Sequence, residues 1–288
     1  MAKIILICTL FIIQNLFSQN FTIKGEVRDS KTKAVLSYVN IGIPNENVGT
    51  VSNQEGQFNL KLNDSINLKK EIYFSYIGYK TKTIKIGELK KDHQNIVALE
   101  SDMNQLKEVV VSLKKPKQKK IGRASKGLGL MHMNFYTYSE KDVDDRRSKE
   151  VGMKMKIKKD CRIDDLNFNV TSNDFKSLKF RLNFYAIKDN LPSDLLLSKD
   201  IIFEIKDGFL GWFKVDLKPY DIYIDKENEE FAVTIQWLES KKIEEKSKYF
   251  AISIAKSPTS TFYYREKGMD SWTKSNSSLS FYLNGMCD

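Results

Sequence analysis

Apolar and polar residues alternate with a period of two through the first third of the chain. Apolar side chains recur at every second position in several short runs, which cover residues 21–27, 39–43, 58–62, 72–76 and 84–86. Residues that favour turns, such as Asp29 with Ser30 and Asn63 with Asp64, stand between the runs. Short alternating runs separated by polar turns are typical of β-sandwich strands, because each strand buries one face and exposes the other. This part of the chain is therefore predicted to form a β-sandwich.

The same alternation returns after residue 150 and continues to the end of the chain. It covers residues 151–157, 166–170, 178–186, 213–217, 231–237, 250–254, 262–264 and 279–283. Half-buried strands in this number, without a clear helical period, predict a second sandwich and favour a jelly-roll-like form. Trp237 shares the apolar face of its run with Val233 and Ile235, so we expect it in the core.

These patterns predict an all-β protein with two β-sandwich domains. Residues 1–18 have the features of a signal peptide, namely Lys3, an apolar run and the small residue Ser18 at the cleavage position. Residues 19–113 hold the first sandwich, residues 114–150 a basic linker and run-in, and residues 151–288 the second sandwich. No later stretch has the length of a membrane-spanning helix. We therefore expect an exported protein of the periplasm, the outer membrane or the cell exterior.

Four blocks of sequence in the first domain carry a resemblance to a known family. They are residues 25–29 (GEVRD), 39–41 (VNI), 49–58 (GTVSNQEGQF) and 74–79 (FSYIGY). Together, over residues 21–113, they resemble the carboxypeptidase regulatory-like domain, a small transthyretin-like sandwich. Gly56 suits a tight turn with a positive φ, and Gly78 permits a bulge or a close backbone approach. Ser52 and Asn53 stand where the family usually has Thr-Asp, and both pairs support the turn through side-chain oxygens.

The resemblance implies a non-catalytic domain. The family includes accessory domains of metallocarboxypeptidases and amino-terminal extensions of TonB-dependent outer-membrane receptors. In those receptors a plug and a large barrel follow the extension, whereas here 177 residues follow residue 111, so a complete receptor is not expected. Residues 106–111 (LKEVVV) resemble the segment that ends such extensions and acts as a TonB box. The same residues also fit the last strand of the sandwich, and the sequence leaves both interpretations open.

The net charge of +10 is concentrated in one short segment. Residues 114–126 hold seven basic and no acidic residues, whereas residues 127–288 hold equal numbers of each sign. Nucleic-acid binding requires a basic face on a folded domain, so a nucleic-acid partner is not expected. A solvated linker and contact with an anionic membrane surface are the two interpretations of the segment.

Two cysteines, Cys161 and Cys287, follow the signal segment. An exported protein permits a disulfide between them, and two unpaired structural thiols fit the sequence equally well. The pair is therefore a candidate disulfide whose geometry the sequence does not give.

Motifs for enzyme chemistry are missing. The chain has two histidines, His93 and His132, and it contains no His-x-x-Glu pair, phosphate loop or nucleophile elbow. Acidic clusters around Asp142 and Asp225 lie in polar, loop-like surroundings without an apolar frame for acid–base catalysis. We therefore predict no catalytic residue, no metal site and no cofactor.

Four aromatic residues are the candidate ligand-binding positions. Trp212 shares its face with Lys214, Tyr185 and Tyr282 lie on the polar faces of their strands, and Trp272 lies in a turn. An exposed aromatic ring beside polar groups can stack on a sugar or anchor a protein interface. A ring packed under a loop, or isolated on the surface, is the alternative for each position.

An exported, non-catalytic binding or assembly protein of the cell envelope is the function that the sequence favours. Its first sandwich is expected to act as a scaffold and its second to carry recognition of an envelope protein or a glycan, with outer-membrane association. A carbohydrate-binding accessory protein that uses the second sandwich is the first alternative. A carboxylate-dependent hydrolase is the second.

Overall fold

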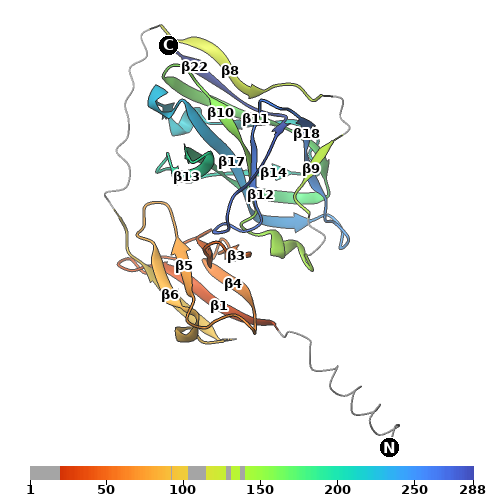
Figure 1. Cartoon of the computed structure of the whole chain (residues 1–288). Helices are drawn as coiled ribbons and strands as arrows, with labels where there is room; N and C mark the ends of the chain where they lie inside the picture. The colour runs from red at the N-terminus through yellow and green to blue at the C-terminus, as the bar shows by residue number, and fades with distance from the viewer. Residues whose placement is uncertain (1–19, 92, 103–114, 128–130, 137–139) are drawn as a thin grey trace, which may run out of the picture.

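The computed structural model describes residues 20–91, 93–102, 115–127, 131–136 and 140–288. These residues form strands and short 3₁₀ turns that build two β-sandwiches, so the prediction of an all-β, two-sandwich protein is confirmed. Figure 1 shows the first sandwich, coloured red to orange-yellow, beside the larger second sandwich, coloured from the yellow of β8 through green to blue. The expected signal peptide and residues 106–111 lie outside the described residues. Within the described ranges, no helix has the length and apolar character needed to cross a membrane.

The first sandwich consists of two sheets that enclose one core. The β1 sheet has the order β4-β1-β7 and contains β1 (Asn20–Asp29), β4 (Gln57–Asn63) and β7 (Gln94–Leu99). The β2 sheet has the order β3-β2-β5-β6 and contains β2 (Asn40–Ile43), β3 (Val48–Val51), β5 (Glu71–Ser75) and β6 (Lys82–Lys85). A 3₁₀ turn, η1 (Ile86–Glu88), follows β6. Alternate residues of these strands, such as Ile23, Leu60 and Phe74, point inward and form the core.

The turn before β4 explains the Ser-Asn pair that departs from the family pattern. The Ser52 hydroxyl is fully buried, accepts from the Val39 amide at 2.8 Å and donates to the Leu36 carbonyl at 3.0 Å. The Asn53 side chain accepts from the main-chain amide of Gln57 at 2.7 Å. Gly56 has a φ of +74°, as predicted for a tight turn. The side-chain oxygens of the Ser-Asn pair therefore support the turn, as expected.

Glycine is favoured at position 78 for a reason other than the bulge or close backbone approach that the sequence suggested. Its φ is +80°, and an added Cβ would meet no atom within 4 Å. The backbone conformation therefore favours glycine at this position, and no close backbone approach is involved.

The second sandwich also consists of two sheets. The β12 sheet has the order β13-β12-β17-β10-β19-β20, with β14 also paired to β12. Its strands are β10 (Glu150–Lys156), β12 (Phe175–Lys188), β13 (Leu191–Leu195), β14 (Ile201–Lys206), β17 (Glu230–Lys242), β19 (Phe262–Arg265) and β20 (Thr273–Ser275).

The β11 sheet covers the other side of the same core. It has the order β21-β18-β11-β22-β8, with β15 and β16 also paired to β11 and β9 paired to β18. Its strands are β8 (Lys117–Arg123), β9 (His132–Asn134), β11 (Cys161–Asn173), β15 (Gly211–Asp216), β16 (Ile222–Ile224), β18 (Phe250–Lys256), β21 (Ser277–Leu279) and β22 (Phe281–Cys287). Short 3₁₀ turns η2 (Val143–Arg146), η3 (Lys218–Tyr220) and η4 (Lys226–Asn228) connect strands. The long strands β10, β11 and β12 alternate between the sheets, as do β17, β18 and β19, so the sandwich is jelly-roll-like.

Aromatic side chains fill the centre of the second sandwich. Trp237 has no exposed surface, and the rings of Phe135, Phe180 and Phe250 surround it at centroid distances of 5.7, 5.4 and 6.0 Å. All three contacts are edge-on or tilted, which is the favourable geometry for aromatic pairs. The expected core position of Trp237 is confirmed.

The segment expected to be a linker, residues 114–150, contributes strands to the second sandwich. β8 pairs with β22 over its whole length, from Lys117 opposite Cys287 to Arg123 opposite Phe281, and Figure 1 shows the two strands side by side. The expected start of the second sandwich at residue 151 is therefore wrong. The physical reason is that β8 is an edge strand in which Ile121 is the one fully buried side chain among the described positions. Lysines at its exposed positions hide the alternation.

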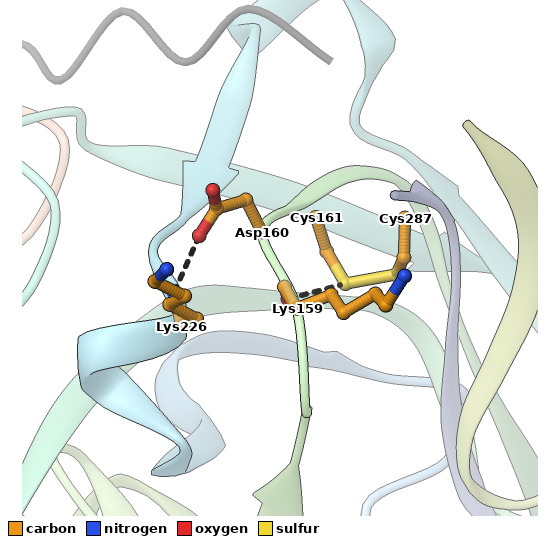
Figure 2. Close-up of a disulfide and its surroundings, with 5 residues drawn as sticks. All are labelled: Lys159, Asp160, Cys161, Lys226 and Cys287. Carbon is orange, nitrogen blue, oxygen red and sulfur yellow. Dashed lines mark hydrogen bonds between the residues drawn. A yellow bond between two sulfur atoms is a disulfide. The ribbon is translucent and has the colours of Figure 1, made fainter. Parts of the chain in front are cut away.

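Cys161 and Cys287 form a disulfide that connects β11 to β22 (Figure 2). The two residues are direct cross-strand partners and their Cα atoms are 4.1 Å apart, although they are 126 residues apart in sequence. Beside the disulfide, the main-chain amide of Lys226 donates to Asp160 Oδ1 at 2.8 Å (Figure 2). The bridge therefore connects the beginning of β11 to the last residue of β22.

Loss of the disulfide is expected to lower the free energy of unfolding of the second sandwich. The bridge closes a loop of 126 residues, and the restriction of the unfolded chain is worth roughly 4 kcal/mol in the loop-entropy treatment. The double variant Cys161→Ala, Cys287→Ala should unfold at a lower urea concentration than the wild type. The same shift should follow addition of a reductant to the wild type but not to the variant. Equal midpoints for the oxidised and reduced wild type would contradict this expectation.

Candidate functional site

The first sandwich is fixed to the outer face of the β12 sheet by hydrogen bonds from buried side chains. Arg181 on β12 donates from Nη2 to the main-chain carbonyl of Tyr38 at 2.9 Å. Gln236 on β17 donates from Nε2 to Asn40 Oδ1 at 2.8 Å. The Tyr38 hydroxyl donates to Glu239 Oε2 at 2.9 Å. These contacts hold the start of the β2 sheet against the two central strands of the β12 sheet.

Apolar side chains pack in the same interface. Tyr38 and Val51 of the first sandwich contact Leu238 and Ile202 of the second, and neither Val51 nor Leu238 has exposed surface. An interface with a buried apolar centre and hydrogen-bonded polar groups has the character of a stable association. The two sandwiches are therefore held together by apolar packing and hydrogen bonds, in addition to the chain that connects them.

The residues under this interface come from one row across the β12 sheet. Arg181 lies opposite Gln236, Gln236 lies opposite Glu150, and Glu150 lies opposite Arg265. Because side chains alternate along each strand, this row points away from the apolar core formed by neighbours such as Phe180. The alternation thus places two arginines and a glutamate on the outer face, where the first sandwich and the adjacent loops cover them.

The Arg181 guanidinium is paired with Asp200. Its Nε and Nη2 atoms donate to the two Asp200 oxygens at 2.6 and 3.0 Å, and its Nη1 atom donates to Gln236 Oε1 at 3.3 Å. Burial alone lowers the pKa of Arg181, but the Asp200 carboxylate outweighs it and holds the pKa above its ordinary value. Arg181 therefore stays protonated, and the Asp200 carboxylate balances its positive charge.

Glu150 is the centre of a second buried network. It has no exposed surface, and it accepts from Asn183 Nδ2 at 2.7 Å, from the Tyr185 hydroxyl at 3.0 Å and from the Thr234 hydroxyl. Arg265 donates to its other oxygen from Nε at 2.9 Å. Every one of these donors lies on a strand of the β12 sheet, so the carboxylate is held rigidly and its charge is balanced.

Tyr185 and Trp272, two of the predicted ligand-binding residues, meet beside this network. Their ring centroids are 5.7 Å apart, and the Arg265 guanidinium lies 4.3 Å from the centroid of the Trp272 ring. Tyr185 is 7% exposed, so the expectation that it is an outward, exposed aromatic is wrong. Burial and the neighbouring Glu150 raise the pKa of its hydroxyl, because the negative form is disfavoured there. Covering by the rest of the protein, which strand alternation does not reveal, accounts for the difference.

A cleft of about 300 Å³ lies between the two sandwiches above these networks. The lining residues are Asn40, Ser75, Tyr76, Ile77, Tyr79 and Thr81 from the first sandwich, and Arg181, Asn183, Tyr185 and Leu195 from the second. The rings of Tyr76 and Tyr79 are 5.5 Å apart, and the Arg181 guanidinium is 5.8 Å from the Tyr76 ring. Aromatic walls with a few fixed polar groups are the usual composition of a ligand site. The cleft is our candidate functional site.

Both sandwiches contribute to this cleft, which is why the sequence did not reveal it. Tyr76 and Tyr79 belong to the FSYIGY block, where they indicated only a fold family. The alternation of β12 placed Arg181, Asn183 and Tyr185 on one polar face, and this was the one available signal. No sequence pattern indicated that the first sandwich would face that row.

Trp212 and Tyr282, the other two predicted ligand-binding residues, lie on the outer face of the β11 sheet. Their ring centroids are 5.2 Å apart in an edge-to-face arrangement. The four candidates therefore form two separate pairs on different sheets, and their role in binding a ligand stays a prediction.

The acidic cluster near Asp142 has structural roles. Asp142 and Asp145 form a reciprocal cap at the start of η2, and Asp145 pairs with Lys61 of the first sandwich at 2.6 Å. Arg146 in the same turn is buried and pairs with Glu140. Among the residues that the structure describes, no group of histidine, cysteine, aspartate and glutamate side chains could hold a metal ion. These contacts explain why the cluster is acidic without invoking catalysis.

Comparison with known proteins identifies the first sandwich. The family model of the CarboxypepD_reg-like domain matches residues 23–111, so this part of the chain is such a domain. Over 95 residues, the chain is 34% identical to the TonB-dependent receptor P3 of Formosa agariphila. That match covers 33% of this chain and 9% of the receptor, so the chain spans a small part of its relative's length.

Solved structures give no further assignment. The major pilin subunit BcpA of Bacillus cereus matches with 9% identity and a TM-score of 0.18, over 91% of this chain and 69% of that one. The infectious bursal disease virus Gx strain structure matches with 12% identity and a TM-score of 0.21, over 95% of this chain and 68% of that one. Scores this low do not relate the folds.

Replacing Arg181 is expected to loosen the first sandwich from the second. The variant Arg181→Met leaves Asp200 without its ion-pair partner and the Tyr38 carbonyl without its donor, which should cost roughly 3 kcal/mol. Hydrogen–deuterium exchange should then increase in residues 36–54 of the first sandwich. Arg162→Met removes an ion pair with Asp164 at the surface of the β11 sheet and serves as the control. Unchanged exchange in Arg181→Met would contradict the assigned role of this arginine.

Tyr76 should make stability depend on alkaline pH. Burial and the Asp200 carboxylate raise the pKa of Tyr76 from 10.0 to about 12. Below the ordinary value, the phenol is neutral in both the folded and the unfolded state, and its full contribution is present. As the pH rises from about 10 to 12, the unfolded state loses this proton first, so the free energy of unfolding falls.

The measurement is urea unfolding across this pH range. Tyr76→Phe should lose less stability than the wild type, whereas Tyr249→Phe, at a side chain that is 41% exposed, should behave like the wild type. Identical pH dependence in Tyr76→Phe and the wild type would contradict the assignment.

Proposed function

We propose that this chain is a non-catalytic binding or assembly protein of the cell envelope. In this proposal the CarboxypepD_reg-like domain is the docking scaffold and the second sandwich carries recognition. The matched family over residues 23–111 and the TonB-dependent receptor that shares this domain support an envelope context. The expected signal segment at residues 1–18 agrees with export.

The observation that carries the proposal is the packed interface that forms the cleft. A domain held only by a flexible linker could not contribute to a site on its neighbour, because its position would vary. Here Arg181 and Gln236 fix the first sandwich at the Tyr38 carbonyl and the Asn40 side chain. Tyr76 is thereby set facing the polar face of β12. A scaffold domain that completes a site on its partner is the arrangement of a binding protein.

The charges around the cleft support binding rather than hydrolysis. No carboxylate is among the residues that line it. The two nearest acidic side chains in the networks below, Asp200 and Glu150, are paired with Arg181 and Arg265. A carboxylate held by an arginine is neither a good proton donor nor a free base at neutral pH. This cleft therefore does not support the hydrolase alternative.

Carbohydrate binding by the second sandwich is the alternative with an observation in its favour. Tyr185 is buried and so does not offer a stacking surface. Trp212 and Tyr282, in contrast, are partly exposed and lie together on the β11 sheet. This alternative is compatible with envelope assembly, because one surface can hold a glycan while another contacts a protein.

The experiment is a capture from outer-membrane extract with the mature chain, residues 19–288, followed by mass spectrometry. We expect the chain to retain one outer-membrane protein reproducibly. Ile96 on β7 is 67% exposed and gives the first sandwich an apolar contact point on an edge strand. The variant Ile96→Lys should therefore reduce capture.

Two controls make the result specific. Trp212→Ala changes the far sheet and should leave capture of the membrane protein unchanged if the first sandwich is the docking unit. Capture that is lost in Trp212→Ala and kept in Ile96→Lys would reverse the assigned roles. Turnover of peptides or glycans by the purified chain would contradict the non-catalytic proposal.

A further inference from the structure

The outer face of the β11 sheet carries an aromatic pair that the core does not need. Trp212 on β15 lies opposite Asn169 of β11, and Tyr282 on β22 lies opposite Asn167. The inner face of the same strands already fills the core with side chains such as Phe168. Two large rings on the solvent side of a filled sheet therefore need another explanation than core packing.

Amide and carboxylate groups lie in a row next to the rings. Asp165, Asn167 and Asn169 are buried on β11, and Asn284 on β22 donates from Nδ2 to Asp165 Oδ1 at 2.7 Å. Two atoms of this row, Asn169 Nδ2 and Asn284 Oδ1, are buried without a hydrogen-bond partner among the described residues. Buried polar atoms in native proteins are nearly always paired, so an unpaired donor and an unpaired acceptor indicate a missing partner. Asn169 is 4% exposed and lies directly opposite Trp212, so the missing partner belongs at the ring pair.

The charge beside the rings is positive. Lys120 on β8 places its Nζ atom 5.4 Å from the centroid of the Tyr282 ring. Within the described part of the chain, Lys120 has no acidic side chain within ion-pair distance. Lys214, on the opposite side of the ring pair, is 60% exposed and shares Asp165 at 3.3 Å. Lys120 thus lies on one side of the ring pair and Lys214 on the other.

We infer that this surface, formed by Trp212, Tyr282, the neighbouring amide row and Lys120, binds an acidic oligosaccharide. The C–H face of a pyranose ring carries partial positive charge and stacks on the negative face of an aromatic ring. Sugar hydroxyls both donate and accept, which matches one free donor and one free acceptor in the amide row. A carboxylate on the sugar complements Lys120, whose ammonium group lies beside the Tyr282 ring.

A single-stranded nucleic acid fits these features less well. Successive bases require rings arranged as a series of parallel platforms, whereas Trp212 and Tyr282 are inclined at 68° to each other. The inference deepens the proposed function by naming a ligand class for the second sandwich, and it does not depend on the cleft between the sandwiches.

The test is isothermal titration of the purified mature chain with a galacturonic acid hexamer and, in parallel, with maltohexaose. We expect the acidic hexamer to bind, to bind more weakly as salt is added, and to bind more tightly than the neutral hexamer. Trp212→Ala and Tyr282→Ala should each weaken binding about tenfold, as expected for loss of one stacking contact. Lys120→Gln should weaken the acidic hexamer and leave the neutral one unchanged.

Controls separate this result from misfolding and from the proposed function. Trp272→Phe alters the aromatic pair on the other sheet and should leave sugar binding intact. If Trp212→Ala unfolds more easily, Trp212→Phe and Lys120→Gln give the same test without a large cavity. The sugar titration contains no membrane extract, so failure to capture an envelope protein does not affect it.

Three outcomes would overturn the inference. The first is the absence of binding to the acidic hexamer by the wild type, and the second is unchanged binding in Trp212→Ala. The third is binding of an oligothymidylate as tight as that of the acidic hexamer, which would assign the surface to nucleic acid.

Discussion

Burial of charge on the outer face of the β12 sheet is the constraint on which the arrangement of the whole molecule depends. Glu150 has no contact with solvent and Arg181 almost none, although both lie on the side of the sheet that faces away from the core. An ion buried without a partner costs several kcal/mol, so each must be paired and then covered. Pairing comes from Arg265 and Asp200, and cover for Arg181 comes from the first sandwich, whose Tyr38 carbonyl accepts one of its N–H groups. The position of the first sandwich is therefore set by a hydrogen-bonding requirement of the second.

The two outer faces of the second sandwich differ in whether their polar groups are paired. On the β12 sheet the polar groups are satisfied by one another and by the first sandwich, which leaves a rigid and nearly neutral floor under the cleft. On the β11 sheet no domain covers the surface in the described structure, and the amide row around Asn169 retains unpaired atoms. A satisfied network gives rigidity, whereas a buried polar atom without a partner costs free energy. The sandwich thus has one face for assembly with its own scaffold and one that remains available.

Much of the fold could be predicted from the sequence, because strand alternation is a local property. It indicated both sandwiches and the burial of Trp237, and the four motif blocks indicated the family of the first domain. Edge strand β8 was missed because an edge strand needs few buried side chains, and here Ile121 alone is fully buried among its lysines. The site was harder to predict, since Tyr185 lies on the polar face of β12 as expected and yet is buried. What covers a sheet face depends on contacts between segments far apart in sequence, and no local pattern records them.

The position of β22 has a consequence for how the protein is made. This strand follows all the other described strands in sequence, yet it lies between β11 and β8 and carries the second cysteine of the disulfide. Until residues 281–287 have been synthesised, β11 lacks its β22 neighbour over this stretch, and β8 has no strand to pair with. The described strands of the first sandwich all come from the first hundred residues, so they are available for pairing earlier. During synthesis, the first sandwich can therefore fold early, while the second sandwich stays open until residues 281–287 are available and oxidation of Cys161 with Cys287 closes it.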